Sequence, residues 1–94
     1  MDQSKIALPA SLDLAAAEAL KEMLIAAVDK GGDLVIDGSG VEKVGTPCIQ
    51  LIVSASRTLR ESGHSMKLEE PSEALGAALA ELGLSADPQE WSTP

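Results

Sequence analysis

The chain has 94 residues, a length that suits one domain, so we expect a single domain over residues 1–94. Its formal charge is −8 at pH 7, and an acidic surface repels both nucleic-acid phosphates and anionic membranes. Trp91 is the only aromatic residue, so the chain also lacks the stacking platforms that single-stranded nucleic acids need.

The first predicted elements are a short strand and a long helix. Residues 5–9 (KIALP) form a strand candidate that Pro9 ends or places at a sheet edge. Asp13 suits a helix N-cap, because its carboxylate can accept hydrogen bonds from the amides of the first turn. A helix over residues 14–30 follows from apolar residues at helical spacing, with a glycine of the Gly31-Gly32 pair as its left-handed cap: Leu14, Ala17, Leu20, Met23, Leu24, Ala27 and Val28.

A strand, a turn and a second helix come next. Residues 33–37 (DLVID) are apolar on both faces in the middle, which is typical of a strand covered by helices. After a turn at residues 38–40, residues 41–44 could form a single helical turn or a loop. Thr46 is of the N-cap type, and Pro47 is favoured at the first helical position. We expect a helix over residues 47–62, capped by Gly63, with this apolar face: Ile49, Ile52, Ala55, Ser56 and Leu59.

The C-terminal part predicts one more strand and one more helix. Residues 64–69 form the strand, with Met66 and Leu68 pointing inward. Pro71-Ser72 opens a helix over residues 72–83, whose apolar stripe is formed by Leu75, Ala78, Leu79 and Leu82. We expect Trp91 to pack back onto the body of the domain, because an exposed Trp would leave a large apolar surface in water.

The alternation of strands and helices indicates the fold class. Crossovers from strand through helix to strand are right-handed and place the strands parallel. We therefore predict an α/β domain: a small mixed, partly parallel sheet of about four strands packed with three or four helices. In its core we expect four residues to be buried together, because each lies on the apolar side of its element: Leu24, Ile36, Ile52 and Leu79.

Few residues are suited to catalysis or metal binding. His64 and Cys48 are the only histidine and cysteine, and alone they provide neither a metal site nor a nucleophile–base pair. Cys48 could be a dipole-stabilised thiolate or a small buried side chain. The glycines of residues 38–40 lack the spacing of phosphate-binding loops and indicate a turn. We therefore expect a protein that is not an enzyme and has no metal or cofactor.

Thr46 has two interpretations. As a helix N-cap it would stabilise the domain by about 1 kcal/mol. As a phosphorylation site it would place a phosphate at a helix N-terminus, where the amides and the dipole favour negative charge. Such a phosphate adds about two negative charges to the surface, which would release a partner docked there.

The sequence favours a cytoplasmic protein without direct membrane insertion. A single cysteine cannot form an intramolecular disulfide, which fits a reducing compartment. The first residues lack the basic start and the apolar core of a signal peptide, and no apolar run approaches the roughly 20 residues that span a bilayer.

The order of these segments resembles the STAS domain, which occurs in bacterial anti-sigma factor antagonists and in a portion of sulfate transporters. The matching segments extend over nearly the whole chain: residues 11–13 (SLD), 34–37 (LVID), 41–46 (VEKVGT), 60–63 (RESG), 71–75 (PSEAL) and 82–84 (LGL). The resemblance implies the STAS fold, as in the anti-sigma factor antagonists.

In that family the loop before the second helix usually reads Asp-Ser-Ser-Gly or Asp-Thr-x-Gly, and its first hydroxyl residue accepts phosphate from a GHKL-type kinase. Here the family Asp falls on Gly45, the acceptor on Thr46, the next residue on Pro47 and the Gly on Cys48. The resemblance thus implies Thr46 as the phosphoacceptor candidate. It also implies the following partner-binding residues: Asp13, Ser39, Gly45, Thr46, Pro47, Cys48, Ile49 and Gln50.

The resemblance implies a non-enzymatic regulatory module that binds a GHKL-type kinase through residues 45–50 and is switched at Thr46. The kinase would be an anti-sigma kinase or the chemotaxis histidine kinase CheA. The alternative is a small STAS subunit of a lipid-transport ABC system, because STAS-like subunits with a Thr in this loop occur there. An enzyme is the third alternative, for which the residues offer no nucleophile–base pair or metal set.

Overall fold

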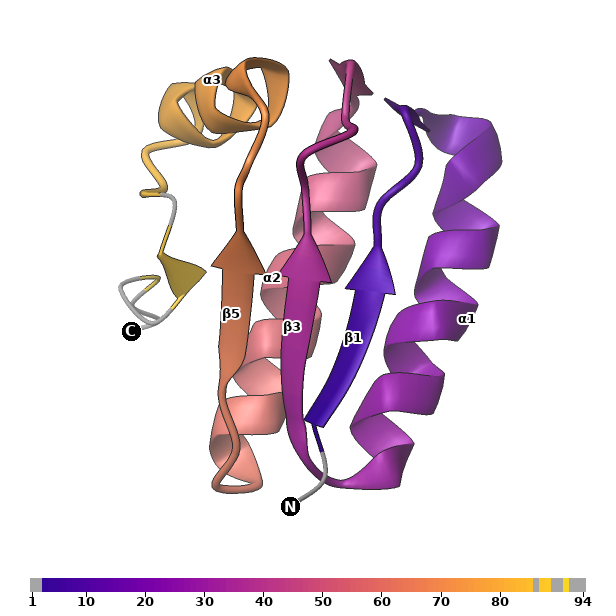
Figure 1. Ribbon diagram of the computed structural model, residues 1–94, viewed down its shortest axis with the longest axis vertical. Helices are drawn as coiled ribbons and strands as arrows, with labels where there is room; N and C mark the ends of the chain where they lie inside the picture. Colours follow the sequence, from indigo (N-terminus) through magenta and orange to yellow (C-terminus); the bar gives the residue numbers. More distant parts are fainter. Residues whose placement is uncertain (1–2, 86, 89–90, 92–94) are drawn as a thin grey trace.

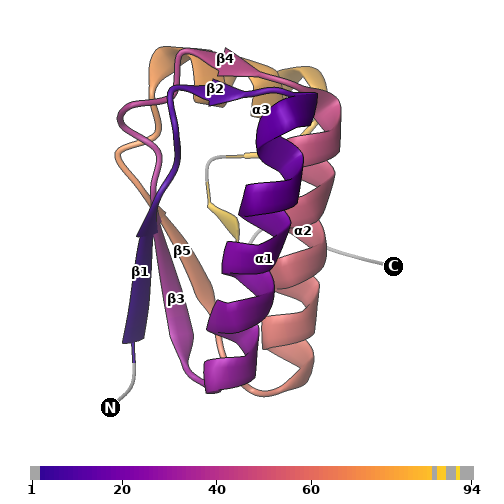
Figure 2. The same cartoon turned by 90° about the vertical axis from the view of Figure 1, so that its right-hand side faces the viewer.

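The computed structural model describes residues 3–85, 87, 88 and 91. Its main sheet has the strand order β1-β3-β5, and both strand pairings are parallel. Figures 1 and 2 show the two long helices, α1 and α2, side by side on one face of this sheet. The strands of the main sheet are β1 (Gln3–Ala7), β3 (Asp33–Asp37) and β5 (Met66–Glu69), and the helices are α1 (Leu14–Lys30), α2 (Thr46–Glu61) and α3 (Glu73–Glu81).

The predicted α/β class is confirmed, and the strands are divided differently from the single sheet we expected. Two short strands, β2 (Ser11–Leu12) and β4 (Lys43–Val44), pair in parallel and form a second small sheet. Figure 2 shows this second sheet beside the N-terminal ends of α1 and α2. Every strand pairing in the described residues is parallel, so the sheets there are not mixed in direction.

The start and end of α1 are as predicted. The carboxylate of Asp13 accepts a hydrogen bond from the amide of Ala16 at 3.0 Å, which makes Asp13 the N-cap. At the other end Gly31 adopts a φ of 71°, in the left-handed region that glycine tolerates, and its amide donates to the backbone oxygen of Val28. Local side-chain and backbone chemistry therefore fixes the length of this helix.

The core lies between the main sheet and the helices. Leu24, Ile36, Ile52 and Leu79 are each at most 4% exposed and belong to one apolar cluster, so the predicted core is confirmed. The helices cover one face of β3, not both as its sequence suggested.

Val35 is buried without belonging to the apolar cluster, and its neighbours in register are Lys5 and Lys67. Both lysines approach the carboxylate of Glu69, at 3.4 and 4.0 Å. Val35 thus sits between the two lysines in a row across the three strands. The ammonium groups of both lysines extend toward Glu69, which lies two residues after Lys67 along β5.

Two predictions about the segment before α2 are wrong. Residues 41–44 form neither a helical turn nor a loop throughout, because Lys43–Val44 pairs with Ser11–Leu12 as β4. The N-cap of α2 is Gly45, so Thr46 is the first helical residue and not the cap. At the other end the C-cap is Ser62 and not Gly63 as predicted, and Gly63 follows it with a φ of 83°, in the left-handed region that commonly ends a helix.

Helix α3 and the segment after it cover the remaining edge of the core. The Ser72 hydroxyl caps α3 by accepting from the amide of Leu75 at 3.1 Å. Leu82 is 46% exposed, so the predicted stripe ends at Leu79, because Leu82 follows the last helical turn. Trp91 is buried as predicted, and its indole N–H donates to the backbone oxygen of Ser85 at 2.7 Å.

Arg60 links α2 to Pro88 and Trp91. Its guanidinium donates to the backbone oxygens of Trp91 and Pro88 at 3.2 and 3.1 Å.

Among the described residues, none of the helices combines the length and the apolar character that a bilayer crossing requires.

Candidate functional site

The pairing of β2 with β4 brings the starts of α1 and α2 together. The amide of Gly45 donates to the backbone oxygen of Leu12 at 2.7 Å, which extends the two-stranded sheet by one hydrogen bond. Residue 13 caps α1 and residue 45 caps α2, so both helices begin at the same end of the molecule (Figure 2). We call the group formed by Asp13 and residues 45–50 the junction.

Cys48 ties the two helix starts together from inside. Its thiol donates to the backbone oxygen of Asp13 at 3.4 Å, and its side chain is fully buried. Burial raises the pKa of this thiol, and the negative charge of Asp13 raises it further. Cys48 is therefore a protonated buried side chain at neutral pH, and the alternative of a stabilised thiolate is wrong.

The N-terminus of α2 has no side-chain cap and carries an exposed residue, Thr46, in its first turn. Its N-cap, Gly45, has an extended backbone and provides no side-chain hydrogen bond to the first turn. The backbone oxygen of Gly45 accepts instead from the amides of Cys48 and Ile49, at 3.1 and 3.4 Å. Thr46 is exposed, and the first turn contains no acidic residue, so the positive end of the helix dipole is not neutralised from within the helix.

The junction contains most of the predicted site residues, although not all of them face solvent. Asp13, Thr46, Pro47 and Gln50 are exposed, and Gly45 is half-buried. In contrast, Cys48 and Ile49 are 0% and 2% exposed, so they support the junction and present no side chain to a partner. The surface that a partner could contact is therefore smaller than the predicted set.

Ser39 lies apart from the junction. It belongs to the turn before β4, whereas Thr46 follows β4. Its amide donates to a carboxylate oxygen of Asp37 at 2.9 Å, the pattern of an Asx turn, which confirms that residues 38–40 form a turn. This bond is the main cause of the lowered pKa of Asp37. The Ser39 hydroxyl lowers this pKa further, burial raises it, and the charge of Lys5 lowers it.

The departures from the family loop pattern have a structural counterpart. A Cβ atom on Gly45 would lie 3.1 Å from the backbone oxygen of Leu12, so a larger residue there would need that strand to shift by a few tenths of an ångström. Cys48 occupies the family glycine position and fills a buried site against Asp13. Both departures, Gly45 in place of the family Asp and Cys48 in place of the family Gly, thus lie where the start of α2 packs closely against residues 12 and 13.

His64 lies outside the junction. Its Nδ1 atom is 3.8 Å from a carboxylate oxygen of Asp33. Asp33 begins β3, and His64 lies two residues before β5, so the strand that we expected over residues 64–69 starts at Met66. Within the described residues, no group of three or more His, Cys, Asp or Glu side chains is placed to hold a metal ion.

The sequence analysis placed Leu14 on the apolar stripe of α1, which is wrong because Leu14 is exposed, and it did not single out Ile25, which is also exposed. Leu14 is 77% exposed beside the junction, and Ile25 is 50% exposed farther along the helix. The signal was present in the spacing, because residues 14 and 25 are 11 apart, close to three whole helical turns, and Ile25 falls outside the predicted stripe.

A comparison with protein families agrees with the resemblance noted in the sequence. The family model described as "Mlab, STAS domain" matches residues 1–86, which is most of the chain. No curated protein matches the chain. The chain therefore belongs to the STAS domain family, a family of regulatory and generally non-enzymatic domains that interact with other proteins.

Proposed function

We propose that this STAS domain is a cytoplasmic regulatory module that docks on a GHKL-type kinase through the exposed part of the junction, and that phosphorylation of Thr46 releases it. The observation that carries the proposal is the position of Thr46. It is exposed in the first turn of a helix whose N-cap forms no side-chain bond.

The helix start favours a phosphate at Thr46. The phosphate would lie at the positive end of the α2 dipole, in a first turn that contains no acidic residue. The domain could therefore carry the modification without unfolding. The phosphate would add a charge of about −2 to the docking face. A kinase surface that fits unmodified Thr46 has no hydrogen-bond donors placed for the phosphate oxygens, so docking would be weakened.

The exposed residues of the junction supply the docking face. Thr46, Pro47 and Gln50 come from the start of α2, and Asp13 comes from the start of α1. The protein carries a net charge of −8, so a kinase with a positive face would be steered toward it. The kinase would be an anti-sigma kinase or a CheA-like histidine kinase, as the family resemblance implies.

Phosphate transfer provides the test. The purified protein is incubated with the candidate kinase and Mg–ATP, and the modified residue is located by mass spectrometry. We expect one phosphate on Thr46, none on the Thr46→Val variant, and an unchanged level on Ser62→Ala. Ser62 is the control, because it is an exposed hydroxyl residue at the opposite end of α2. Phosphate on another residue, or none, would remove the switch and leave constitutive docking.

The second candidate function is a small STAS subunit of a lipid-transport ABC system. STAS-like subunits with a threonine in this loop occur in such systems, and the matching family model is described as "Mlab, STAS domain". In this function Thr46 would contact the transporter ATPase directly and need not be modified. Co-purification separates the two candidates, because a transporter ATPase would favour the subunit and a soluble kinase would favour the switch.

A further inference from the structure

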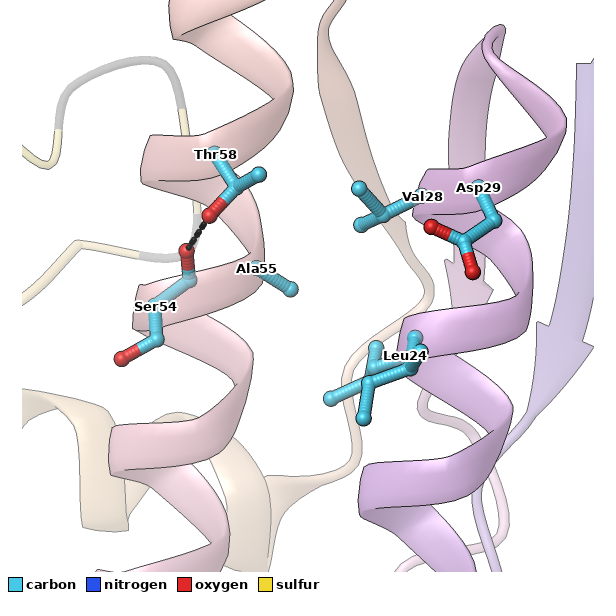
Figure 3. A pocket seen from close by; sticks show the side chains of 7 residues that line it. Leu24, Val28, Asp29, Ser54, Ala55 and Thr58 are labelled. Atoms are coloured by element: carbon cyan, nitrogen blue, oxygen red, sulfur yellow. Dashed lines mark hydrogen bonds between the residues drawn. The ribbon is translucent and has the colours of Figure 1, made fainter.

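A groove of about 280 Å³ separates the outer sides of α1 and α2 (Figure 3). Two buried apolar side chains form its floor: Leu24 and Ala55, which are 3% and 7% exposed. Ile25 also lines the groove and is half exposed. The groove is lined by Leu24, Ile25, Val28 and Asp29 of α1, and by Ser54, Ala55 and Thr58 of α2.

The α2 wall of the groove is more apolar than its residue types suggest. The hydroxyl of Thr58 donates to the backbone oxygen of Ser54 at 3.1 Å, so it is already satisfied within the helix. Figure 3 shows the methyl group of Thr58 turned toward α1. Asp29 is the one charged residue among those that line the groove.

The groove continues the surface of the junction. Leu14 and Ile25 lie about three turns apart on the same flank of α1, and Leu14 directly follows Asp13. On α2 the residues of the facing flank are spaced by four, three and four, which also keeps them on one side: Pro47, Leu51, Ser54 and Thr58. The residues that line up with the groove therefore reach back to both helix starts, with the exposed Glu18 and Lys21 between Leu14 and Ile25 on α1.

The charges beside the groove select its occupant. On α1, Glu18, Glu22 and Asp29 are exposed together with Lys21, and on α2 the exposed Arg57 and Glu61 carry opposite charges, so acidic residues predominate on these two flanks. Lys30 lies on the other side of the helix, in a hollow against β1. A second copy of this chain is a poor occupant, because each copy carries a charge of −8. A partner segment with basic residues beside an apolar face complements both features.

We propose that the docked partner lays an amphipathic helix along the α1–α2 groove, with an apolar side chain against Leu24 and Ala55 and a lysine or arginine beside Asp29. This inference rests on the proposed docking function and names the part of the partner that binds. The groove lies beyond the junction along both helices, so it adds a second contact that phosphorylation of Thr46 does not touch directly.

Synthetic helical peptides test the groove without the whole partner. One peptide has leucines at positions i, i+3, i+4 and i+7 with lysine and arginine elsewhere, and its acidic twin has glutamate in place of each basic residue. We expect the basic peptide to shift backbone amide NMR signals along residues 14–29 and 47–58. The acidic twin should bind at least roughly tenfold more weakly, because like charges would face one another.

Two matched variants locate the binding. Ile25→Asp should lower the affinity for the basic peptide roughly tenfold or more. Leu82→Asp should leave this affinity unchanged, and it is the matched control because Ile25 and Leu82 are similarly exposed, at 50% and 46%. Asp29→Lys should narrow the preference for the basic peptide over the acidic one. Equal binding of the two peptides, no binding of either, signals that shift elsewhere, or full affinity of Ile25→Asp would each overturn the proposal.

Titrating the same variants against the candidate kinase separates this inference from the proposed function. Weak binding of both Thr46→Glu and Ile25→Asp supports both. Weak binding of Thr46→Glu alone keeps the junction and overturns the groove. Weak binding of Ile25→Asp alone keeps the groove and removes the switch at Thr46. Melting curves of each variant check that the domain remains folded.

Discussion

The starts of α1 and α2 lie side by side, and they are built differently. The start of α1 is closed by the Asp13 carboxylate, which accepts from the amide of Ala16 at 3.0 Å. The start of α2 has Gly45 as its cap and no side-chain bond. Ser72 closes α3 in the same way as Asp13 closes α1. The side-chain cap is thus absent at the helix start that carries Thr46.

Tertiary contacts replace the missing cap of α2. The amide of Gly45 bonds to Leu12, and the thiol of Cys48 bonds to the backbone of Asp13. These two hydrogen bonds fix the start of α2 against residues 12 and 13. The exposed side chain of Thr46 is therefore not needed as a cap. This arrangement is the basis of our proposal that Thr46 can carry a phosphate without unfolding the domain.

The largest predicted effect concerns what the two helices share. Leu24 of α1 and Ile52 of α2 are buried in one cluster, so truncating either to alanine should cost about 2–5 kcal/mol. Leu14→Ala is the control, because Leu14 is 77% exposed and its loss should cost less than about 0.5 kcal/mol. Chemical denaturation measures all three. A loss below about 1 kcal/mol at Leu24 or Ile52 would show that the position is not core.

The second prediction removes the contact that joins the two starts. Cys48→Gly restores the residue type of the family loop but places glycine inside a helix, at a cost of about 1 kcal/mol. It also deletes a fully buried side chain, which costs about 1 kcal/mol more. We expect a total loss of about 2 kcal/mol by denaturant titration. An unchanged midpoint would mean that the start of α2 does not depend on Cys48.

The third prediction compares the two starts directly. Asp13→Ala should destabilise the domain by about 1 kcal/mol, because it deletes the cap of α1. Thr46→Ala should change stability by less than about 0.5 kcal/mol, because Thr46 is exposed and is not the cap. Thermal melts of both variants under one buffer condition measure the difference. Equal losses would contradict the distinction between a closed and an open helix start.

The smallest predicted effect lies outside both starts, at the turn before β4. The pKa of Asp37 is lowered in the folded protein, from an ordinary value of 3.8, mainly because its carboxylate accepts from the amide of Ser39. The charged carboxylate therefore stabilises the fold above about pH 4, and this contribution is lost as the pH falls through the lowered pKa.

Asp37→Asn should accordingly be less stable than the wild-type protein at neutral pH, and the gap should close in acid. Melting temperatures over a pH series measure the gap, with Glu18→Gln on the exposed side of α1 as the control. A gap of constant size from neutral to acid pH would contradict the role of the carboxylate.

Sequence reasoning worked where the determining residues are close together in the chain. The Asp13 cap, the Gly31 end and the apolar spacing of α1 are local patterns, and the structure confirms them. The sequence did not reveal β4, because its pairing joins residues 11–12 to residues 43–44. The same long-range pairing makes Gly45 the cap of α2, which is why the cap interpretation of Thr46 is wrong.

The candidate site was predicted in part for the same reason. Position 46 and its exposure at the start of α2 follow from the family pattern and the local helix signal. Ile49 was assigned both to the apolar face of the helix and to the partner-binding set, and its burial shows that the first assignment is correct. Ser39 precedes β4 and Thr46 follows it, an arrangement that the sequence did not reveal, and the partner-binding role of Ser39 stays a prediction.

Calorimetric titration of Thr46→Glu against the candidate kinase, paired with Thr46→Ala, tests the open helix start most directly. A negative side chain at Thr46 is compatible with the N-terminus of α2, so the variant should stay folded in a melting curve. We predict that Thr46→Glu binds the kinase more weakly by about 1–3 kcal/mol, whereas Thr46→Ala binds nearly as well as the wild-type protein. Equal affinity of Thr46→Glu and the wild-type protein would contradict the account.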